Sequence, residues 1–112
     1  MIIKIDYKGD LCSINQKYIS RRFVLSKRYR EAKESLMWCA KLSKQKIEGT
    51  PDLKMKLETY YPRKHDVDCF CKFVLDSLQD AEVYQNDSQI VELLVIKRIS
   101  KDSRAIITIE TA

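Results

Sequence analysis

The sequence has few of the residues that mark several non-globular protein classes. Only two glycines and two prolines occur among its 112 residues, which excludes collagen-like and low-complexity chains. No apolar run approaches the roughly 18 to 20 residues that a membrane span needs. The first six residues are too short an apolar stretch for a signal peptide. We therefore expect a soluble cytoplasmic protein with one folded domain over residues 1–112.

The usual cysteine signatures of metal sites are also missing. The four cysteines, Cys12, Cys39, Cys69 and Cys71, form no C-x-x-C pair. The single histidine, His65, cannot complete a usual structural zinc set with them. On a helix, two residues that are two positions apart point about 200° from each other, so Cys69 and Cys71 are not expected to share a metal. We expect reduced thiols.

Charge is plentiful and unevenly distributed. Residues 1–50 contain 12 basic and 5 acidic side chains, a charge of +7, whereas residues 51–112 contain 9 and 11, a charge of −2. A basic half joined to a slightly acidic half suggests a surface for polyanions and a separate use for the carboxylates. The alternative is that the lysine-rich segments are simply solvated.

The apolar spacing predicts the element order β-α-β-α-β-β. In the first half, residues 2–5 suggest a short strand, residues 7–22 an irregular segment and residues 23–25 a brief extended piece. Ser26 is expected to cap a helix that reaches about Ile47. Gly49 and Pro51 stop that helix, because proline cannot continue it and glycine tolerates a left-handed terminal conformation.

In the second half, the alternation over residues 53–58 predicts a strand that ends near residue 61. Apolar residues at helical spacing over 67–78 predict a helix that starts at Asp66 or just after it. A turn at 85–88 precedes a strand over 90–99, and residues 100–103 lead into 105–109 as the second half of a hairpin. We expect an α/β or α+β fold of two layers, with two helices on a small mixed sheet.

The second predicted helix carries the acidic residues of interest. Asp68, Lys72 and Asp76 share one polar stripe, and Asp66 stands at the N-cap. Taken alone, Asp-x-Asp at a helix start is more often structural than catalytic, because capping is common. A helix of about 13 residues travels roughly 20 Å. The connection before Asp87 can span up to roughly 30 Å, so Asp87 can return to the end that carries Asp66.

Three carboxylates near one point repel each other, and a hard cation such as Mg²⁺ or Mn²⁺ relieves that repulsion. Such an ion polarises a phosphoryl oxygen, lowers the pKa of bound water and stabilises a leaving alkoxide. Lys72 could stabilise charge on the reacting phosphorus centre. Its more frequent role at this spacing is an ion pair with Asp68 and Asp76.

A short basic run precedes the acids. Arg63 and Lys64 are expected to hold a phosphate backbone beside the metal. We interpret His65 as a contact to that backbone or a solvated residue rather than a metal ligand, because the acids already suit a hard metal.

These residues lie in two blocks that match the pattern of a known family. Residues 62–78 read PRKHDVDCFCKFVLDSL, and residues 83–91 read VYQNDSQIV. The first block resembles the basic run, D-x-D-N-x-x-K and terminal D-x-L of the RusA family of Holliday junction resolvases. The second is similar to that family's D-D-x-Q-[VI] block. Residues 13–15 with Tyr18, and residues 26–30, resemble its S-x-N loop and the entry to its first helix, so the likeness covers most of the chain.

The resemblance implies a RusA-like homodimer that binds four-way DNA junctions and nicks two strands symmetrically with Mg²⁺, with Mn²⁺ as an alternative, during recombination and repair. By position, Asp66, Asp68 and Asp87 would be the metal-binding catalytic acids and Lys72 a catalytic basic residue. A further set of residues would contact the branched DNA, mostly through phosphates: Asn15, Lys17, Arg21, Arg22, Lys27, Arg28, Arg63 and Lys64.

Two positions depart from the family pattern. Cys69 stands where asparagine is usual, and Asn86 where a first aspartate is frequent. Losing the asparagine removes an amide that both donates and accepts, which weakens the positioning of metal or phosphate. The acids are intact, so we expect activity to persist. The alternatives are a non-catalytic nucleic-acid-binding protein with the same fold, or a nuclease for another branched DNA or RNA.

Overall fold

The computed structural model describes residues 2–13, 18–19 and 24–112. Its elements follow in the order β1 (Ile2–Lys8), β2 (Tyr18–Ile19), β3 (Val24–Leu25), α1 (Lys27–Leu42), β4 (Leu53–Tyr61), α2 (Cys71–Asp80), the 3-10 helix η3 (Asp87–Gln89), β5 (Ile90–Ile99) and β6 (Arg104–Thr111). The predicted order β-α-β-α-β-β and the α+β class are confirmed. The small antiparallel pair of β2 and β3 adds to that order between β1 and α1.

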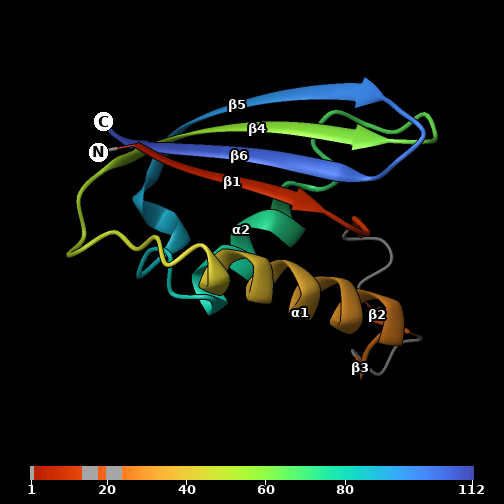
Figure 1. Cartoon of the computed structure of the whole chain (residues 1–112), viewed down its shortest axis with the longest axis horizontal. Coiled ribbons are helices and arrows are strands. Elements are labelled where there is room, and N and C mark those ends of the chain that lie inside the picture. The colour runs from red at the N-terminus through yellow and green to blue at the C-terminus, as the bar shows by residue number, and fades with distance from the viewer. Residues whose placement is uncertain (1, 14–17, 20–23) are drawn as a thin grey trace.

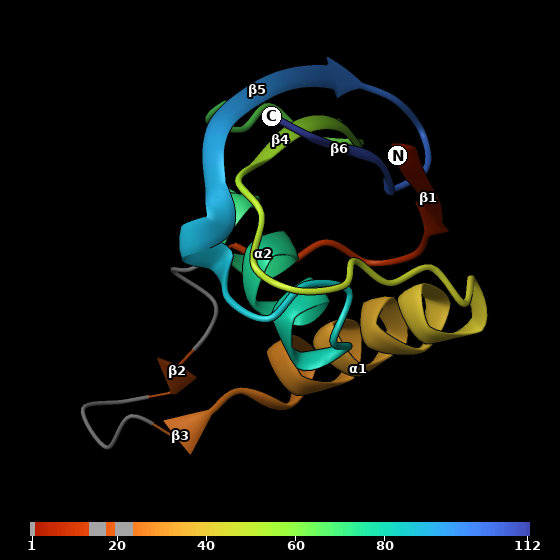
Figure 2. The ribbon, with the colours of Figure 1, turned by 90° about the vertical axis from the view of Figure 1, so that its left-hand side faces the viewer.

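The fold has two layers, and both helices pack on one face of a four-stranded mixed sheet (Figures 1 and 2). The strand order is β1-β6-β4-β5, with β4 and β5 parallel and the other neighbours antiparallel. Within the part of the chain that the structure describes, no helix is both long and apolar enough to cross a bilayer.

Alternation along three strands builds the core. Every second side chain of β1, β4 and β6 points toward the helices and is buried: Ile3, Ile5, Tyr7, Leu53, Met55, Leu57, Ala105, Ile107 and Ile109. The helices supply the opposing layer, which includes Leu36 of α1 and Val74 of α2. The rings of Tyr29 and Phe73 meet edge to face at 5.8 Å between centroids, which joins α1 to α2.

Helix α1 begins as predicted and ends earlier. The Ser26 hydroxyl accepts a hydrogen bond from the Tyr29 amide at 3.1 Å, which is the expected N-cap. The helix stops at Leu42 instead of about Ile47, because Lys44 adopts a left-handed φ of 56° and turns the chain away. Ile47 then reaches the core from an irregular segment, where its amide donates to the Val83 carbonyl at 2.8 Å.

The predicted hairpin of the last two strands is wrong. Strand β6 lies between β1 and β4, whereas β5 pairs with β4 alone at the edge of the sheet. The reason is burial: the inward side chains of β6 are fully buried, while most of β5 is exposed. The strand with the continuous buried face takes the central place.

Candidate active site

Helix α2 begins at Cys71, so the predicted start at Asp66 is wrong. Two successive turns precede it, in which the Cys69 amide donates to the Asp66 carbonyl at 3.3 Å and the Cys71 amide to the Asp68 carbonyl at 3.1 Å. The N-cap is Phe70, with no side-chain capping bond. Main-chain groups therefore shape this segment, and the carboxylates of Asp66 and Asp68 lie on exposed residues at the surface.

Lys72, the second residue of α2, lies between two carboxylates. Its Nζ is 2.9 Å from Asp76 Oδ1 and 3.7 Å from Asp87 Oδ2. The hydrogen bond to Asp76 is the main reason why the pKa of Lys72 is raised above its ordinary value. The ion pair with Asp76 is as predicted, whereas the described residues place Asp87 rather than Asp68 as its second partner. Asp87 thus lies near the first turn of α2, whereas its approach to Asp66 stays a prediction.

The backbone around Asp87 is fixed by three side chains, of which the sequence analysis singled out only Asn86, and for a different reason. The Asp87 amide donates to Gln79 Oε1 of α2 at 2.8 Å. Asn86 caps η3, and Gln89 Oε1 accepts from the Asn86 amide at 3.0 Å, which completes a capping box. Gln89 is buried and donates to the Pro51 carbonyl at 3.1 Å. The Asn-x-x-Gln spacing was the signal that could have identified this cap.

Tyr84 anchors the segment between α2 and η3. Its hydroxyl donates to the Leu75 carbonyl at 2.8 Å. Burial raises the pKa of Tyr84, and the nearby carboxylates of Asp87 and Asp76 raise it further. The phenol therefore stays neutral and acts as a permanent hydrogen-bond donor, which holds the loop against α2.

His65 packs among aromatic rings, and its predicted role as a DNA contact or solvated residue does not fit this position. Its ring lies 5.6 Å from that of Tyr61 and 5.1 Å from that of Phe70, measured between centroids. Its Nδ1 is 2.8 Å from the Arg63 carbonyl, and Lys97 Nζ donates to the His65 carbonyl at 2.7 Å. This packing fixes the end of β4, from which the chain leads to Asp66 and Asp68.

The basic residues predicted to contact DNA differ in their exposure and in their partners. Arg63 and Lys64 are exposed immediately before Asp66, where a phosphate backbone can reach them. Lys27 is exposed at the start of α1, 3.8 Å from Glu31. Four other predicted DNA contacts lie outside the described residues: Asn15, Lys17, Arg21 and Arg22.

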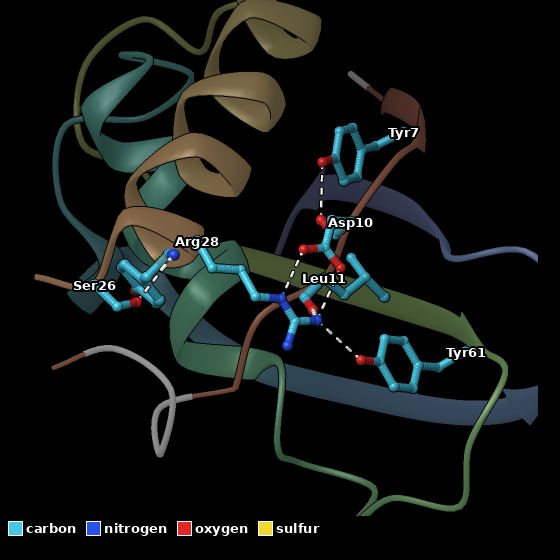
Figure 3. A network of polar contacts seen from close by, with 7 residues as sticks. Tyr7, Asp10, Leu11, Ser26, Arg28 and Tyr61 are labelled. Carbon is cyan, nitrogen blue, oxygen red and sulfur yellow. Dashed lines mark hydrogen bonds and ion pairs between the residues drawn. The ribbon is translucent and has the colours of Figure 1, made fainter. Parts of the chain in front are cut away.

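The guanidinium of Arg28 is engaged within the protein (Figure 3). Its Nε lies 2.9 Å from Asp10 Oδ2 and its Nη2 lies 3.0 Å from Asp10 Oδ1, a two-pronged pair. Nη2 also donates to the Tyr61 hydroxyl at 3.1 Å and to the Leu11 carbonyl at 3.4 Å. The hydrogen bond to Asp10, followed by that to Tyr61, raises the pKa of Arg28. A DNA phosphate would have to compete with these acceptors, so that contact stays a prediction.

The donor chemistry at this end of α2 suits a hard divalent cation, because Asp66, Asp68 and Asp87 all offer carboxylate oxygens. Within the described residues of one chain, no three acidic, histidine or cysteine side chains are arranged to hold a metal ion. Asp87 instead faces the ammonium group of Lys72. The convergence of the three acids around one ion therefore stays a prediction.

Comparison with known proteins identifies the family. No curated protein matches the chain significantly. The family model described as endodeoxyribonuclease RusA matches residues 12–110, which include both helices and both acidic blocks. Members of this family are divalent-metal-dependent nucleases that act on branched DNA junctions. Because the match spans nearly the whole sequence, the chain belongs to the RusA family of endodeoxyribonucleases.

Proposed function

We propose that the protein is a Holliday junction resolvase that nicks four-way DNA junctions symmetrically during recombination and repair, with Mg²⁺ as its ion and Mn²⁺ as an alternative. The observation that carries the proposal is the position of Asp87. Asp87 comes from a separate block of sequence, yet its Oδ2 lies 3.7 Å from Lys72 Nζ. Lys72 itself follows shortly after the exposed Asp66 and Asp68 in the chain. The proposal includes a cytoplasmic location and a single domain over residues 1–112.

Asp66, Asp68 and Asp87 would hold the ion. When bound, a divalent metal polarises the phosphoryl oxygen and lowers the pKa of its water. Lys72 supplies a positive charge that can contact a phosphate oxygen as negative charge develops there. Asp76 holds that ammonium group at 2.9 Å, which restricts where it can lie. The capping box of η3 and the hydrogen bond of the Tyr84 hydroxyl hold the backbone of Asp87 close to α2 and so to Lys72.

The basic residues around the acids would provide the affinity for DNA. Arg63 and Lys64 are exposed beside Asp66, and residues 1–50 carry a charge of +7. Contacts to phosphates give affinity with little choice of sequence, so the shape of the junction dominates recognition. The proposed set comprises Asn15, Lys17, Arg21, Arg22, Lys27, Arg28, Arg63 and Lys64.

A four-way junction presents two strands for cleavage that are related by approximate two-fold symmetry. A homodimer with two-fold symmetry presents two copies of one site in the matching arrangement. One set of acids per 112-residue chain suits this requirement. We therefore include a homodimer in the proposed function.

Cleavage assays test the proposal. Purified protein with Mg²⁺ or Mn²⁺ is expected to nick a four-way junction faster than flap or linear duplex DNA. Asp68→Asn is expected to abolish cleavage and keep junction binding, whereas Asp52→Asn, an exposed acid outside the site, should change neither.

Two other outcomes favour the alternatives. Tight junction binding without cleavage by the unaltered protein in either metal would favour a non-catalytic nucleic-acid-binding protein. Faster cleavage of a flap or a branched RNA would favour another substrate.

A further inference from the structure

The two edges of the sheet differ in how they are protected. At the β1 edge, the side-chain amide of Gln45 imitates a neighbouring strand. Its Oε1 accepts from the Lys4 amide at 3.1 Å, and its Nε2 donates to the Lys4 carbonyl at 3.0 Å. Natural proteins cover sheet edges in this way because unpaired backbone groups invite another chain. The β1 edge is therefore blocked at its centre.

Strand β5 forms the opposite edge and is ten residues long (Figure 2). Four of its apolar side chains are exposed: Val91 by 57%, Leu93 by 38%, Leu94 by 55% and Ile99 by 63%. The described residues place no amide on this edge of the kind that Gln45 provides at β1. Long, apolar, uncovered edges are templates for strand addition.

The charged residues of β5 complement each other under two-fold symmetry. Glu92 and Arg98 are both exposed, and each lies three residues from Val95. Within its own chain Glu92 Oε2 also lies 3.7 Å from Lys54 Nζ, an exposed pair that leaves the other carboxylate oxygen of Glu92 for a partner. In an antiparallel pair of identical strands, a two-fold axis perpendicular to the sheet sets one residue opposite its own copy. With Val95 at the axis, Glu92 lies opposite Arg98 of the partner subunit. By symmetry, Arg98 lies opposite Glu92 of the partner subunit.

With the axis at Val95, apolar residues of one strand also lie opposite apolar residues of the other. Leu94 lies opposite Ile96 of the partner subunit, and Val91 opposite the partner's Ile99. Moving the axis to Leu94 would set Glu92 against the partner's Ile96, and moving it to Ile96 would set Leu94 against the partner's Arg98. On the open face of the sheet, which carries residues 92, 94, 96 and 98, both shifts oppose a charge to an aliphatic side chain, whereas the axis at Val95 does not, so cross-strand pairing there favours Val95.

Lys97 does not disturb this arrangement. In an antiparallel pair centred on Val95 it would lie opposite Leu93 of the partner subunit. Its ammonium group is instead directed at its own chain, where it donates to the His65 carbonyl at 2.7 Å. A lysine that extends across an edge normally prevents pairing, and here the charge is drawn aside.

We propose that β5 pairs antiparallel with β5 of a second copy about a two-fold axis at Val95, which joins the two four-stranded sheets into one. The proposal locates the interface of the homodimer and rests on that part of the proposed function. The partner is another copy of this chain, because the sequence of β5 complements itself in charge and in apolar character.

Charge reversal tests the interface without DNA or metal. Glu92→Arg and Arg98→Glu each place like charges opposite one another twice per dimer, so each should raise the dimer dissociation constant by about tenfold or more. The double variant restores opposite charges and should return to within about threefold of the original value. Sedimentation equilibrium measures all three, and Glu48→Arg, an exposed acid in a loop, serves as the control.

Leu94→Asp provides a second probe, because Leu94 is more than half exposed and its replacement should leave the monomer folded by circular dichroism while abolishing dimers. A monomeric unaltered protein, or a double variant that fails to recover, would overturn the interface. The two proposals fail separately: a dimer that obeys the charge swap but does not cleave refutes the nuclease, whereas cleavage by a dimer insensitive to these variants refutes the pairing of β5.

Discussion

Asp76 holds Lys72 in place, with Asp76 Oδ1 2.9 Å from Lys72 Nζ. Asp76 is 18% exposed in its side chain, whereas Lys72 is 51% exposed. The more buried acid therefore sets the position of the more exposed cation, whose second partner is Asp87 at 3.7 Å. This relationship separates Asp76, a positioning residue, from the acids proposed to bind the metal.

Asp76→Asn is expected to lower kcat for junction cleavage by between about ten- and a hundredfold, because Lys72 would lose its fixed geometry. The KM and the affinity for the junction should change little. Asp76→Glu should recover part of the rate, since it keeps the charge. Melting temperatures of both variants control for folding. A rise in KM at unchanged kcat would assign Asp76 to substrate binding instead.

The cap of η3 offers a test of how Asp87 is oriented. Asn86→Ala removes the side chain that accepts from the Ser88 amide at 2.8 Å, which should cost about 1 kcal/mol of stability and slow cleavage. Asn86→Asp keeps the cap and should keep the rate or raise it. Chemical denaturation and junction cleavage measure the two effects. Equal rates for the alanine and aspartate variants would show that the cap does not orient Asp87.

The exposed cations before Asp66 should be visible in the salt dependence of binding. Arg63→Ala and Lys64→Ala are each expected to reduce the slope of log affinity against log salt by about 0.9 if each neutralises one phosphate. Lys46→Ala, an exposed lysine in the loop after α1, is the matched control. Titrations of a labelled junction at several salt concentrations give the slopes. Slopes equal to that of the unaltered protein would remove Arg63 and Lys64 from the interface.

Arg28 should contribute to stability in addition to its proposed contact with DNA. Its contacts with Asp10 and Tyr61 are partly exposed, so Arg28→Ala should cost about 1 kcal/mol, after allowance for solvent screening. Arg28→Lys keeps the charge but not the two-pronged geometry, and it should lose nearly as much. Urea unfolding provides the values. If Arg28→Ala leaves stability intact and lowers the salt slope, the DNA contact is its only role and the contacts with Asp10 and Tyr61 add nothing to stability.

The pair of Asp6 and Arg104 predicts a specific pH dependence. The hydrogen bond from Arg104 holds the pKa of Asp6 below its ordinary value of 3.8. A lowered pKa in the folded state stabilises the fold above the ordinary value, and this contribution is lost as pH falls through the folded value. Because the pair is exposed, Asp6→Asn should cost at most about 1 kcal/mol at pH 7. Unfolding curves measured down to acid pH should converge for the two proteins.

Local patterns predicted the elements, and contacts between distant residues decided their limits. The alternation from Leu53 to Leu57 is a property of the strand itself, and β4 is found there. The start of α2 at Cys71 follows Phe70, a buried N-cap residue whose ring centroid lies 4.9 Å from that of Tyr61 at the end of β4. The pairing of the last strands was also mispredicted, because the neighbour of a strand is set by the whole sheet.

In the candidate site too, some features could be predicted from the sequence alone and others could not. The reach of the chain depends only on lengths, so it could show that Asp87 is able to return to the start of α2, but not that it does so. The second partner of Lys72 and the packing of His65 depend on which surfaces meet. No spacing in the sequence indicates that the His65 ring lies against both Tyr61 and Phe70.

The central place of β6 also has a consequence for biosynthesis. β6 separates β1 from β4, and both of these strands are made before it. While residues 104–111 are still inside the ribosome, β1 has no partner strand in the sheet, and the inward side chains of Ile107 and Ile109 are missing from the core. The nascent chain therefore cannot close its sheet until β6 has left the ribosome.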